Sequence, residues 1–485
     1  MQGVGKRGLV GLGVATTLAT FQLPAHPFAQ EGSPADQAVE AAKQYAGTTL
    51  TITWEAGLQA LDPLNFSGPL WEELTGIKVN VVEVPFDEMF VKTMAEHRAG
   101  TGAYDVLNVV PSQMPDLVRA GVLEPLDPYI DQYGYRPHLE TIGAVYRDNW
   151  MTVEGTVYGL PDDGDVYILY YRKDLFEDPE NQSEFQAARG YELAPPATWE
   201  RFDDIAGFFT DKYAPELYGT ALIRAVGLVE PFFQERFRVQ GGRFFDPETM
   251  KATINGEAGV KALAGMIGEH AYVPPGAETW GFVEVLAAWL SGDVAMTISW
   301  PPFGRWSAGY GTDTDALSWV PKSQIAGKVG YALPPGGTPE LANGFALGIA
   351  SQSQNKEAAY LFIQWLNSPE ISLQRVQLPY ALRDPYRTTH FSDPEYAGRW
   401  ESAPDYLATL KEAAETGLLD LSILQTASYV EALSRAIQSA ISGMDPQAAL
   451  DQAAAEWDQI TTTVGLDAQR AAYTDWASKP NAYPN

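Results

Sequence analysis

The first part of the chain alternates between strand-like and helix-like hydrophobic patterns, and this alternation limits the fold more than any other feature. Thr49–Trp54, Ile77–Val84 and Val106–Val110 have the alternating or continuous apolar residues that are typical of strands. Helical stretches separate them, one around Leu70–Thr75 and one that ends near Gly100. This order predicts an α/β fold with a doubly wound parallel sheet, in which ligands lie beyond the carboxyl ends of the strands.

A second set of elements follows Gly159. Tyr167–Tyr171, Tyr218–Ile223 and Val294–Ser299 are β-prone, and Phe345–Ala350 resumes as a strand after a stretch rich in Pro and Gly. The chain has 485 residues, of which 45% are hydrophobic, and this is enough for two cores rather than one. We therefore expect two α/β lobes.

The regions outside these patterns are less regular. Residues 31–46 are polar, small and Ala-rich, so they are expected to form a leader, with folded structure beginning at Thr49. The segment after Ser368 is expected to be mainly helical, with several amphipathic stretches.

The N-terminus has the features of a secretory signal peptide. A basic pair precedes the apolar run Gly8–Leu23, and small residues around Ala25 and Ala29 follow. The run is shorter than the roughly 20 residues that a membrane-spanning helix needs. We expect residues 1–29 to be a signal peptide, cleaved after one of the two alanines, and the mature protein to be soluble in the periplasm.

Composition excludes several classes of function. With 62 acidic and 32 basic residues the net charge is −30, which repels nucleic acid and anionic membrane surfaces. The chain has no cysteine, so disulfides, thiolate metal sites and cysteine nucleophiles are excluded. None of the five histidines is spaced from another as metal ligands are. We expect a monomer without a metal, a cofactor or a nucleic-acid partner.

Five groups of residues occur in a fixed order in the middle of the chain. They are Tyr158–Asp165 with Leu169–Phe176, Pro196–Glu200, Gly241-Gly242 with Phe245-Asp246 and Asn255, Gly292–Met296 with Ser299-Trp300, and Ser353–Ala359 with Phe362, Trp365-Leu366 and Ser368–Glu370. Their order and spacing resemble those of the family 1 extracellular solute-binding proteins, the group that includes maltose-binding protein.

The resemblance implies a two-lobed periplasmic binding protein of type II, with a hinge and a ligand cleft between the lobes. It divides the chain into an N-terminal lobe, residues 47–160 plus about 300–366, and a C-terminal lobe, about 161–299 plus 367–485. It also implies that the protein binds a mono- or oligosaccharide or a sugar alcohol by lobe closure and delivers it to the membrane permease subunits of an ABC importer.

Candidate site residues follow from the chemistry of sugars, which need aromatic faces for C–H patches and carboxylates or amides for hydroxyls. Asp162, Asp163 and Asp165 lie close together and would be costly to bury without hydrogen-bond donors. We expect Asp165 first among them, then Asp163. Trp300 ends a predicted strand and is held by the two prolines after it. Further candidates lie at strand ends, in turns or as stacking platforms: Trp54, Glu55, Ser112, Gln113, Gly242, Asn343, Gly344, Arg383, Trp280 and Trp306.

Two other functions stay open at this point. A secreted carbohydrate-active enzyme would need two carboxylates, and Asp163 with Asp165 is a candidate pair. A binding protein for a non-sugar solute such as a polyamine is compatible with the negative net charge. Product formation from sugars would identify the enzyme, and stabilisation by polyamines alone would identify the second alternative.

Overall fold

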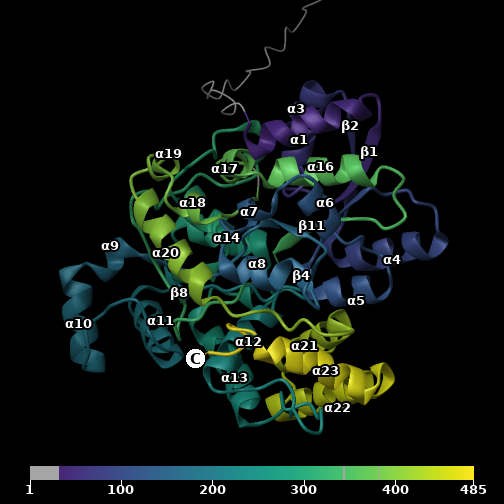
Figure 1. The fold of residues 1–485 in the computed structure, drawn as a ribbon. Coiled ribbons are helices and arrows are strands. Elements are labelled where there is room, and N and C mark those ends of the chain that lie inside the picture. Colours follow the sequence, from purple (N-terminus) through teal and green to yellow (C-terminus); the bar gives the residue numbers. More distant parts are fainter. Residues whose placement is uncertain (1–31, 342–343, 381, 485) are drawn as a thin grey trace, which may run out of the picture.

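The computed structural model describes residues 32–341, 344–380 and 382–484. These residues form two α/β lobes, each built around its own open sheet (Figure 1). Within them, the sheet of the first lobe has five strands in the order β2-β1-β3-β11-β6. The strands are β1 (Thr49–Glu55), β2 (Lys78–Val84), β3 (Val106–Val109), β6 (Leu160–Asp163) and β11 (Phe345–Ile349).

The predicted strands of the first lobe are confirmed, but the sheet is mixed. β1 pairs in parallel with β2 and β3, as predicted, whereas β11 runs antiparallel to β3 and β6. On β11, Leu347 and Ile349 face one hydrophobic core, and Ala346 faces the other, as does Ala350 directly after the strand. This follows from the two-residue repeat of a strand whose two faces are both buried.

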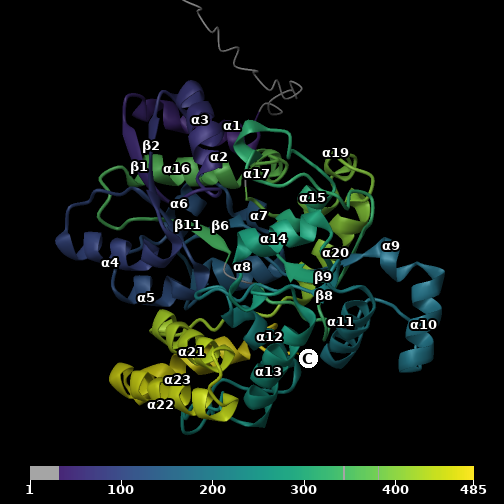
Figure 2. The same cartoon turned by 180° about the vertical axis from the view of Figure 1, so that it is seen from behind.

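Helices cover both faces of this sheet (Figures 1 and 2). On one face lie α1 (Pro34–Ala42), α3 (Ser67–Thr75), α16 (Lys356–Asn367) and α17 (Pro369–Val376). On the other lie α4 (Met89–Ala99) and α5 (Met114–Arg119), and α8 (Ala144–Trp150) packs at the β6 edge beside the hairpin of β4 (Thr152–Val153) and β5 (Thr156–Val157). Shorter helices in the connections are α2 (Leu61–Asn65), α6 (Asp127–Gln132), α7 (Arg136–Leu139), α18 (Thr388–Phe391) and α19 (Pro394–Ala397).

The second lobe has a four-stranded sheet in the order β10-β7-β9-β8 within the described residues. Its strands are β7 (Ile168–Arg172), β8 (Tyr218–Thr220), β9 (Val294–Ser299) and β10 (Val329–Ala332). The helices packed on or beside it are α9 (Lys173–Phe176), α10 (Pro179–Arg189), α11 (Trp199–Tyr213), α14 (Phe282–Ser291), α15 (Pro302–Ser307) and α20 (Ala403–Thr416).

The lobe boundaries differ from the predicted ones in three places. Residues 161–163 of β6 belong to the first sheet, although the sequence assigned them to the second lobe. The other two differences concern β10 and α17. β10 pairs with β7, so residues 329–332 belong to the second sheet, although the sequence assigned them to the first lobe. α17 packs on α16 and α1, so it belongs to the first lobe, although the sequence assigned residues after 367 to the second. Both segments lie close to points where the chain passes between the lobes.

The C-terminal helices extend the second lobe. They are α21 (Thr426–Ile441), α22 (Pro446–Val464) and α23 (Leu466–Ser478), packed on α12 (Glu230–Val239) and α13 (Glu257–Gly268). They also reach the first lobe, because the backbone N–H of Gln425 donates to the carboxylate of Asp116 on α5, at 3.0 and 2.9 Å from its two oxygens. The expected helical C-terminal segment is confirmed.

Helix α1 lies where a leader was predicted. Ser33 caps it by accepting from the backbone N–H of Asp36 at 3.2 Å, and Pro34 occupies its first turn. Ala38 and Ala42 are fully buried against α16. The predicted start of folded structure at Thr49 is therefore wrong, because small side chains bring this helix close to its neighbour rather than marking a linker. The predicted signal peptide lies outside the described residues.

In the described part of the chain, no helix combines the length and the apolar character needed to cross a bilayer.

The segments that connect the lobes meet at Gly164, in the connection between β6 and β7. The backbone N–H of Gly164 donates to the carbonyl of Asp384 at 3.1 Å, and a Cβ here would overlap the carbonyl oxygen of Pro385. The adjacent Asp165 accepts from the backbone N–H of Gly344, in the connection between β10 and β11, at 3.2 Å. Only glycine allows this close approach of backbones.

We predict that Ala38→Asp lowers the free energy of unfolding by about 3 kcal/mol, because it buries a charge without a partner between α1 and α16. Gln37→Asp, which puts the same charge on the exposed face of that helix, should change it by less than about 0.5 kcal/mol. Chemical denaturation measures both. Equal stability of the two variants would show that α1 is not part of the folded core.

Candidate binding site between the lobes

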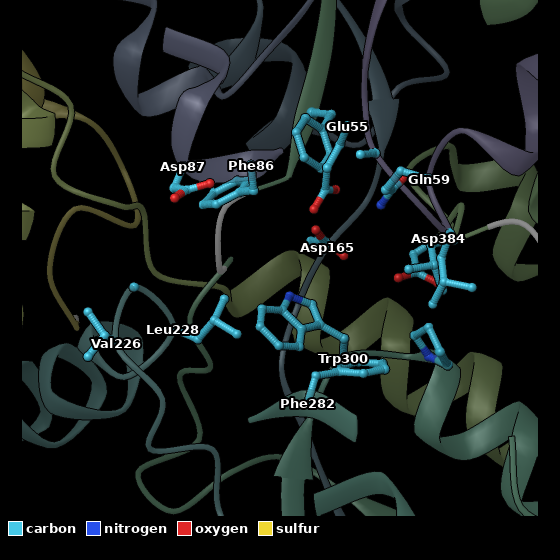
Figure 3. Close-up of a pocket in the computed structure, with 16 residues that line it drawn as sticks. Glu55, Gln59, Phe86, Asp87, Asp165, Val226, Leu228, Phe282, Trp300 and Asp384 are labelled. Atoms are coloured by element: carbon cyan, nitrogen blue, oxygen red, sulfur yellow. The ribbon is translucent and has the colours of Figure 1, made fainter. Parts of the chain in front are cut away.

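A cavity of about 480 Å³ lies between the two lobes (Figure 3). Its first-lobe wall comes from the segments after β1 and β2, whose carboxyl ends meet at one edge of the sheet. Its second-lobe wall comes from the loop before α12, the start of α14 and the segment after β9. Its described lining residues are Glu55, Ala56, Leu58, Gln59, Phe86, Asp87, Asp165, Val226, Gly227, Leu228, Phe282, Trp300, Pro302, Phe345, Leu382 and Asp384.

Aromatic rings form opposite sides of the cavity. In the first lobe, Phe86 meets Phe345 edge to face, with ring centroids 6.3 Å apart. In the second lobe, Phe282 lies 6.0 Å from Trp300, and Tyr167 supports the indole edge to face at 4.9 Å. Trp300 is 9% exposed, so packing fixes its ring while part of it still faces the cavity. Rings held in this way offer preorganised apolar faces to a ligand.

Carboxyl groups provide the polar part of the lining. The Glu55 and Asp165 carboxyl groups point toward one another across the cavity, and Asp384 and the exposed Asp87 lie at its sides (Figure 3). Burial raises the pKa of Glu55 to about 7, although Arg383 opposes this shift. Burial, with the neighbouring acids Asp163, Asp384 and Glu55, raises the pKa of Asp165 well above its usual range.

Asp163, Asp165 and Asp384 form a buried acidic cluster, in which Asp165 and Asp384 line the cavity and Asp163 lies behind them. One oxygen from each lies within 4.8 Å of the others, a spacing that could hold a metal ion. Protein donors satisfy Asp163, which accepts from the Gln59 side chain at 2.8 Å and from the backbone N–H of Asp384 at 2.6 Å. Burial raises the pKa of Asp163 to about 8, and it also raises the pKa values of Asp165 and Asp384.

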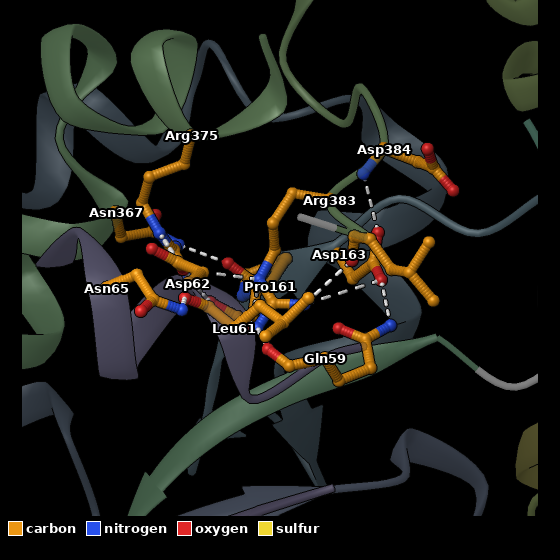
Figure 4. A network of polar contacts seen from close by, with 12 residues as sticks. Gln59, Leu61, Asp62, Asn65, Pro161, Asp163, Asn367, Arg375, Arg383 and Asp384 are labelled. Carbon is orange, nitrogen blue, oxygen red and sulfur yellow. Dashed lines mark hydrogen bonds and ion pairs between the residues drawn. The ribbon is translucent and has the colours of Figure 1, made fainter. Parts of the chain in front are cut away.

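Asp162 belongs to a buried ion-pair network with Arg375 and Arg383. Figure 4 shows these two arginines beside Asp62, and Arg383 links the network to Asp163. The carboxylate of Asp162 lies 2.7 Å from Arg375 and 3.0 Å from Arg383, and Arg375 also donates to Asp62 of α2 at 2.7 Å. Arg383 in turn lies 5.2 Å above the ring of Trp54. These residues join α2, β6, α17 and the segment that follows α17, behind the cavity wall.

The structure brings only some of the predicted site residues to the cavity. Asp165, Glu55 and Trp300 line it. Asp163 lies beneath it and acts on it through Gln59 and Asp384. Gly344 lies beside the cavity, and its backbone N–H donates to the carboxylate of Asp165. Its φ is positive, and a Cβ at this position would overlap the ring of Trp150.

Other predicted residues do not line this cavity. Ser112 and Gln113 line a neighbouring cavity of about 80 Å³, which shares Phe86 and Gly227 with the main one. Asp162, Arg383 and Trp54 are held in the ion-pair network. Asn343 lies outside the described residues.

Packing explains the three remaining predicted residues. A Cβ at Gly242 would overlap the ring of Phe237, so this glycine serves helix packing rather than a ligand. Trp306 is fully buried and donates to the carbonyl of Pro379 at 3.2 Å. Trp280 is partly buried, and its carbonyl accepts from the backbone N–H of Arg224 at 2.8 Å.

Several lining residues were missed by sequence reasoning. Phe86 follows the carboxyl end of β2, so the rule that selected Glu55 after β1 also applied to it. Gln59 stands four residues after Glu55 in the same loop. Phe282 and Asp384 carry no local pattern that distinguishes them, because distant segments bring them to the cavity.

The fold and the site define a two-lobed binding protein of the type II periplasmic class, with its cavity at the junction of the lobes. A family model described as bacterial extracellular solute-binding protein matches residues 36–372. The chain belongs to this family, and the predicted resemblance is confirmed.

Similar proteins include one from Sinorhizobium fredii named probable amino-acid ABC transporter periplasmic-binding protein y4oP. It is 26% identical over 391 residues, which cover 78% of this chain and 81% of that protein. The mannitol-binding protein of Pseudomonas aeruginosa is 28% identical over 274 residues, 55% of this chain and 57% of that protein. An ABC transporter solute-binding protein from Agrobacterium vitis, solved with bound D-mannitol, has a TM-score of 0.69 and 22% identity, covering 86% of this chain and 99% of that chain. It shares the fold.

We predict that Asp162→Ala lowers the free energy of unfolding by about 3–5 kcal/mol, because Arg375 and Arg383 lose a buried partner. Glu140→Ala, which breaks an exposed ion pair with Arg147, should cost less than about 1 kcal/mol. Urea denaturation measures the free energies of unfolding of both variants, with the same dependence on urea concentration assumed for each. A small effect of Asp162→Ala would mean that water or other groups compensate the arginines.

We also predict that stability depends on pH through Glu55. Its pKa is raised to about 7 in the folded protein from 4.5, so the folded state keeps a proton that the unfolded chain releases. The free energy of unfolding should therefore decrease as pH rises from about 4.5 to about 7, by on the order of 3 kcal/mol for this group. Glu55→Gln should flatten this decrease in denaturation at several pH values. An unchanged slope would contradict the raised pKa.

Proposed function

We propose that the protein is the periplasmic substrate-binding component of an ABC importer and that it binds a mono- or oligosaccharide or a sugar alcohol between its lobes. The observation that carries this proposal is the inter-lobe cavity, which combines carboxyl groups with aromatic faces. Carboxylates accept charge-assisted hydrogen bonds from hydroxyls, each worth about 1.5–3 kcal/mol. The rings of Trp300, Phe282 and Phe86 would cover the C–H patches of the ligand.

Lobe closure gives the binding mechanism. A ligand that touches Glu55 and Phe86 of the first lobe and Trp300 of the second favours the conformation in which both walls are close. The connections that pack together at Gly164 form the hinge in this proposal. The permease subunits would recognise the closed form.

The cavity favours a polyhydroxyl ligand over an amino acid. The relative from Sinorhizobium fredii is named as an amino-acid-binding protein, whereas the Pseudomonas aeruginosa relative is named for mannitol. An amino acid brings a carboxylate, which needs a cation or several donors to leave water. None of the described lining residues is Lys, Arg or His. The acidic lining therefore supports the sugar or polyol.

A thermal-shift screen of monosaccharides, disaccharides and alditols tests the proposal. A ligand at about 100 times its dissociation constant should add about 2.7 kcal/mol of stability. Trp300→Ala should weaken the ligand found by at least about tenfold, because an aromatic face of the cavity is lost. Trp280→Ala removes an indole of the same lobe that does not line the cavity, so it should keep full affinity.

The same screen examines turnover. We expect each bound sugar to be recovered unchanged after long incubation, because we propose binding without catalysis. Hydrolysis products would instead support a carbohydrate-active enzyme. Stabilisation by polyamines or amino acids alone would exclude the proposed ligand class.

A further inference from the structure

The cavity and the polar groups beneath it contain more carboxyl groups than arginines. Three buried arginines lie behind the wall, and each has acidic partners. Arg375 and Arg383 pair with Asp62 and Asp162, and Arg305 lies 3.3 Å from Asp384. The acidic groups of this region are Asp62, Asp162, Asp163, Asp165, Asp384 and Glu55, to which Asp87 adds a seventh at the rim. Carboxyl groups thus outnumber guanidinium groups where a ligand would lie.

The excess is concentrated in the lining itself. Glu55 and Asp165, which point toward one another, have no ion-pair partner among the described residues (Figure 3). The guanidinium group of Arg383 lies 3.9 Å from the carboxylate of Asp163. Carboxyl groups buried without a counter-charge hold protons, so their pKa values are raised, and a bound cation would allow both Glu55 and Asp165 to ionise.

The remaining lining suits the same kind of charge. The side-chain oxygen Oε1 of Gln59, which is 5% exposed, has no hydrogen-bond donor in the described part of the protein. The ionised carboxyl groups beside it also accept hydrogen bonds. The polar lining is therefore complementary to a ligand that has many hydrogen-bond donors. An ammonium group has three donors and no acceptor, and it is attracted to the faces of aromatic rings such as Trp300 and Phe282.

We propose that the natural solute carries a protonated amine in addition to hydroxyls, so that the cavity takes an amino sugar or an amino alditol. This inference rests on the proposed function. The amine lies between Glu55 and Asp165, where it supplies the missing positive charge, and the hydroxyls are bound by Gln59 and the outer carboxylates. A cavity of about 480 Å³ lies within the range of small-molecule sites.

Matched ligand pairs test the inference by calorimetry at pH 7. The pairs are D-glucosamine with D-glucose, the dimer of glucosamine with cellobiose, and 1-amino-1-deoxy-D-glucitol with D-glucitol, with spermidine as an amine without hydroxyls. We expect the amine of at least one pair to bind about tenfold or more tightly than its neutral partner. Added salt should reduce this preference.

Variants locate the preference in the cavity. Glu55→Gln keeps the shape of the side chain and removes its charge, so it should reduce the ratio of amine to neutral affinity by about tenfold. Glu72→Gln removes an equal charge from the exposed surface of α3 and should leave the ratio unchanged. An equal effect of both variants would trace the preference to the net charge of the protein and overturn the inference.

The remaining outcomes separate the two proposals. Neutral partners that bind as tightly as the amines, or more tightly, overturn the inference and leave the proposed function intact. Binding of spermidine without binding of any sugar or alditol overturns both. No binding by any probe also overturns the inference, because these pairs represent the ligand class that it names.

Discussion

The close packing of backbone at Gly164 is the constraint on which the rest of the molecule depends. Here the connections between the lobes touch one another without a side chain between them. The neighbours of Gly164 are therefore buried whatever their polarity, and three of them are aspartates. Their burial requires donors, arginines or protons, and this requirement accounts for both the ion-pair network behind the wall and the acidic lining in front of it.

The positions of helices and strands along the sequence could be predicted better than the pairing and packing between them. The parallel part of the first sheet could be predicted because each strand is a separate hydrophobic segment, whereas the pairing of β10 with β7 depends on contacts between distant segments. Helix α1 was missed although Ala35, Ala38, Val39 and Ala42 repeat at helical spacing. Their side chains are small, so the segment resembles a linker in composition. Its position as a packed helix depends on the surface of α16 against which it is buried.

The same limit applies to the site. Glu55 and Trp300 could be selected because each lies at a strand end, where side chains of neighbouring elements converge, and Asp165 because acids so close in sequence require donors when buried. Asp162 looked equivalent to Asp165, but it faces Arg375 and Arg383, and arginines so distant in sequence cannot be assigned to it from the sequence alone. Local chemistry thus indicated which kinds of group the cavity contains, and the tertiary structure decided which of them reach it.

The contact between Gln425 and Asp116 affects more than the attachment of the C-terminal helices. It joins the second lobe to α5 of the first through residues that do not line the cavity, so a rotation that separates these two segments must break it or stretch it. Its strength is therefore part of the free-energy difference between the open and closed forms. Because the apparent dissociation constant scales inversely with the population able to bind, residues that never touch a solute can set the concentration at which it is captured.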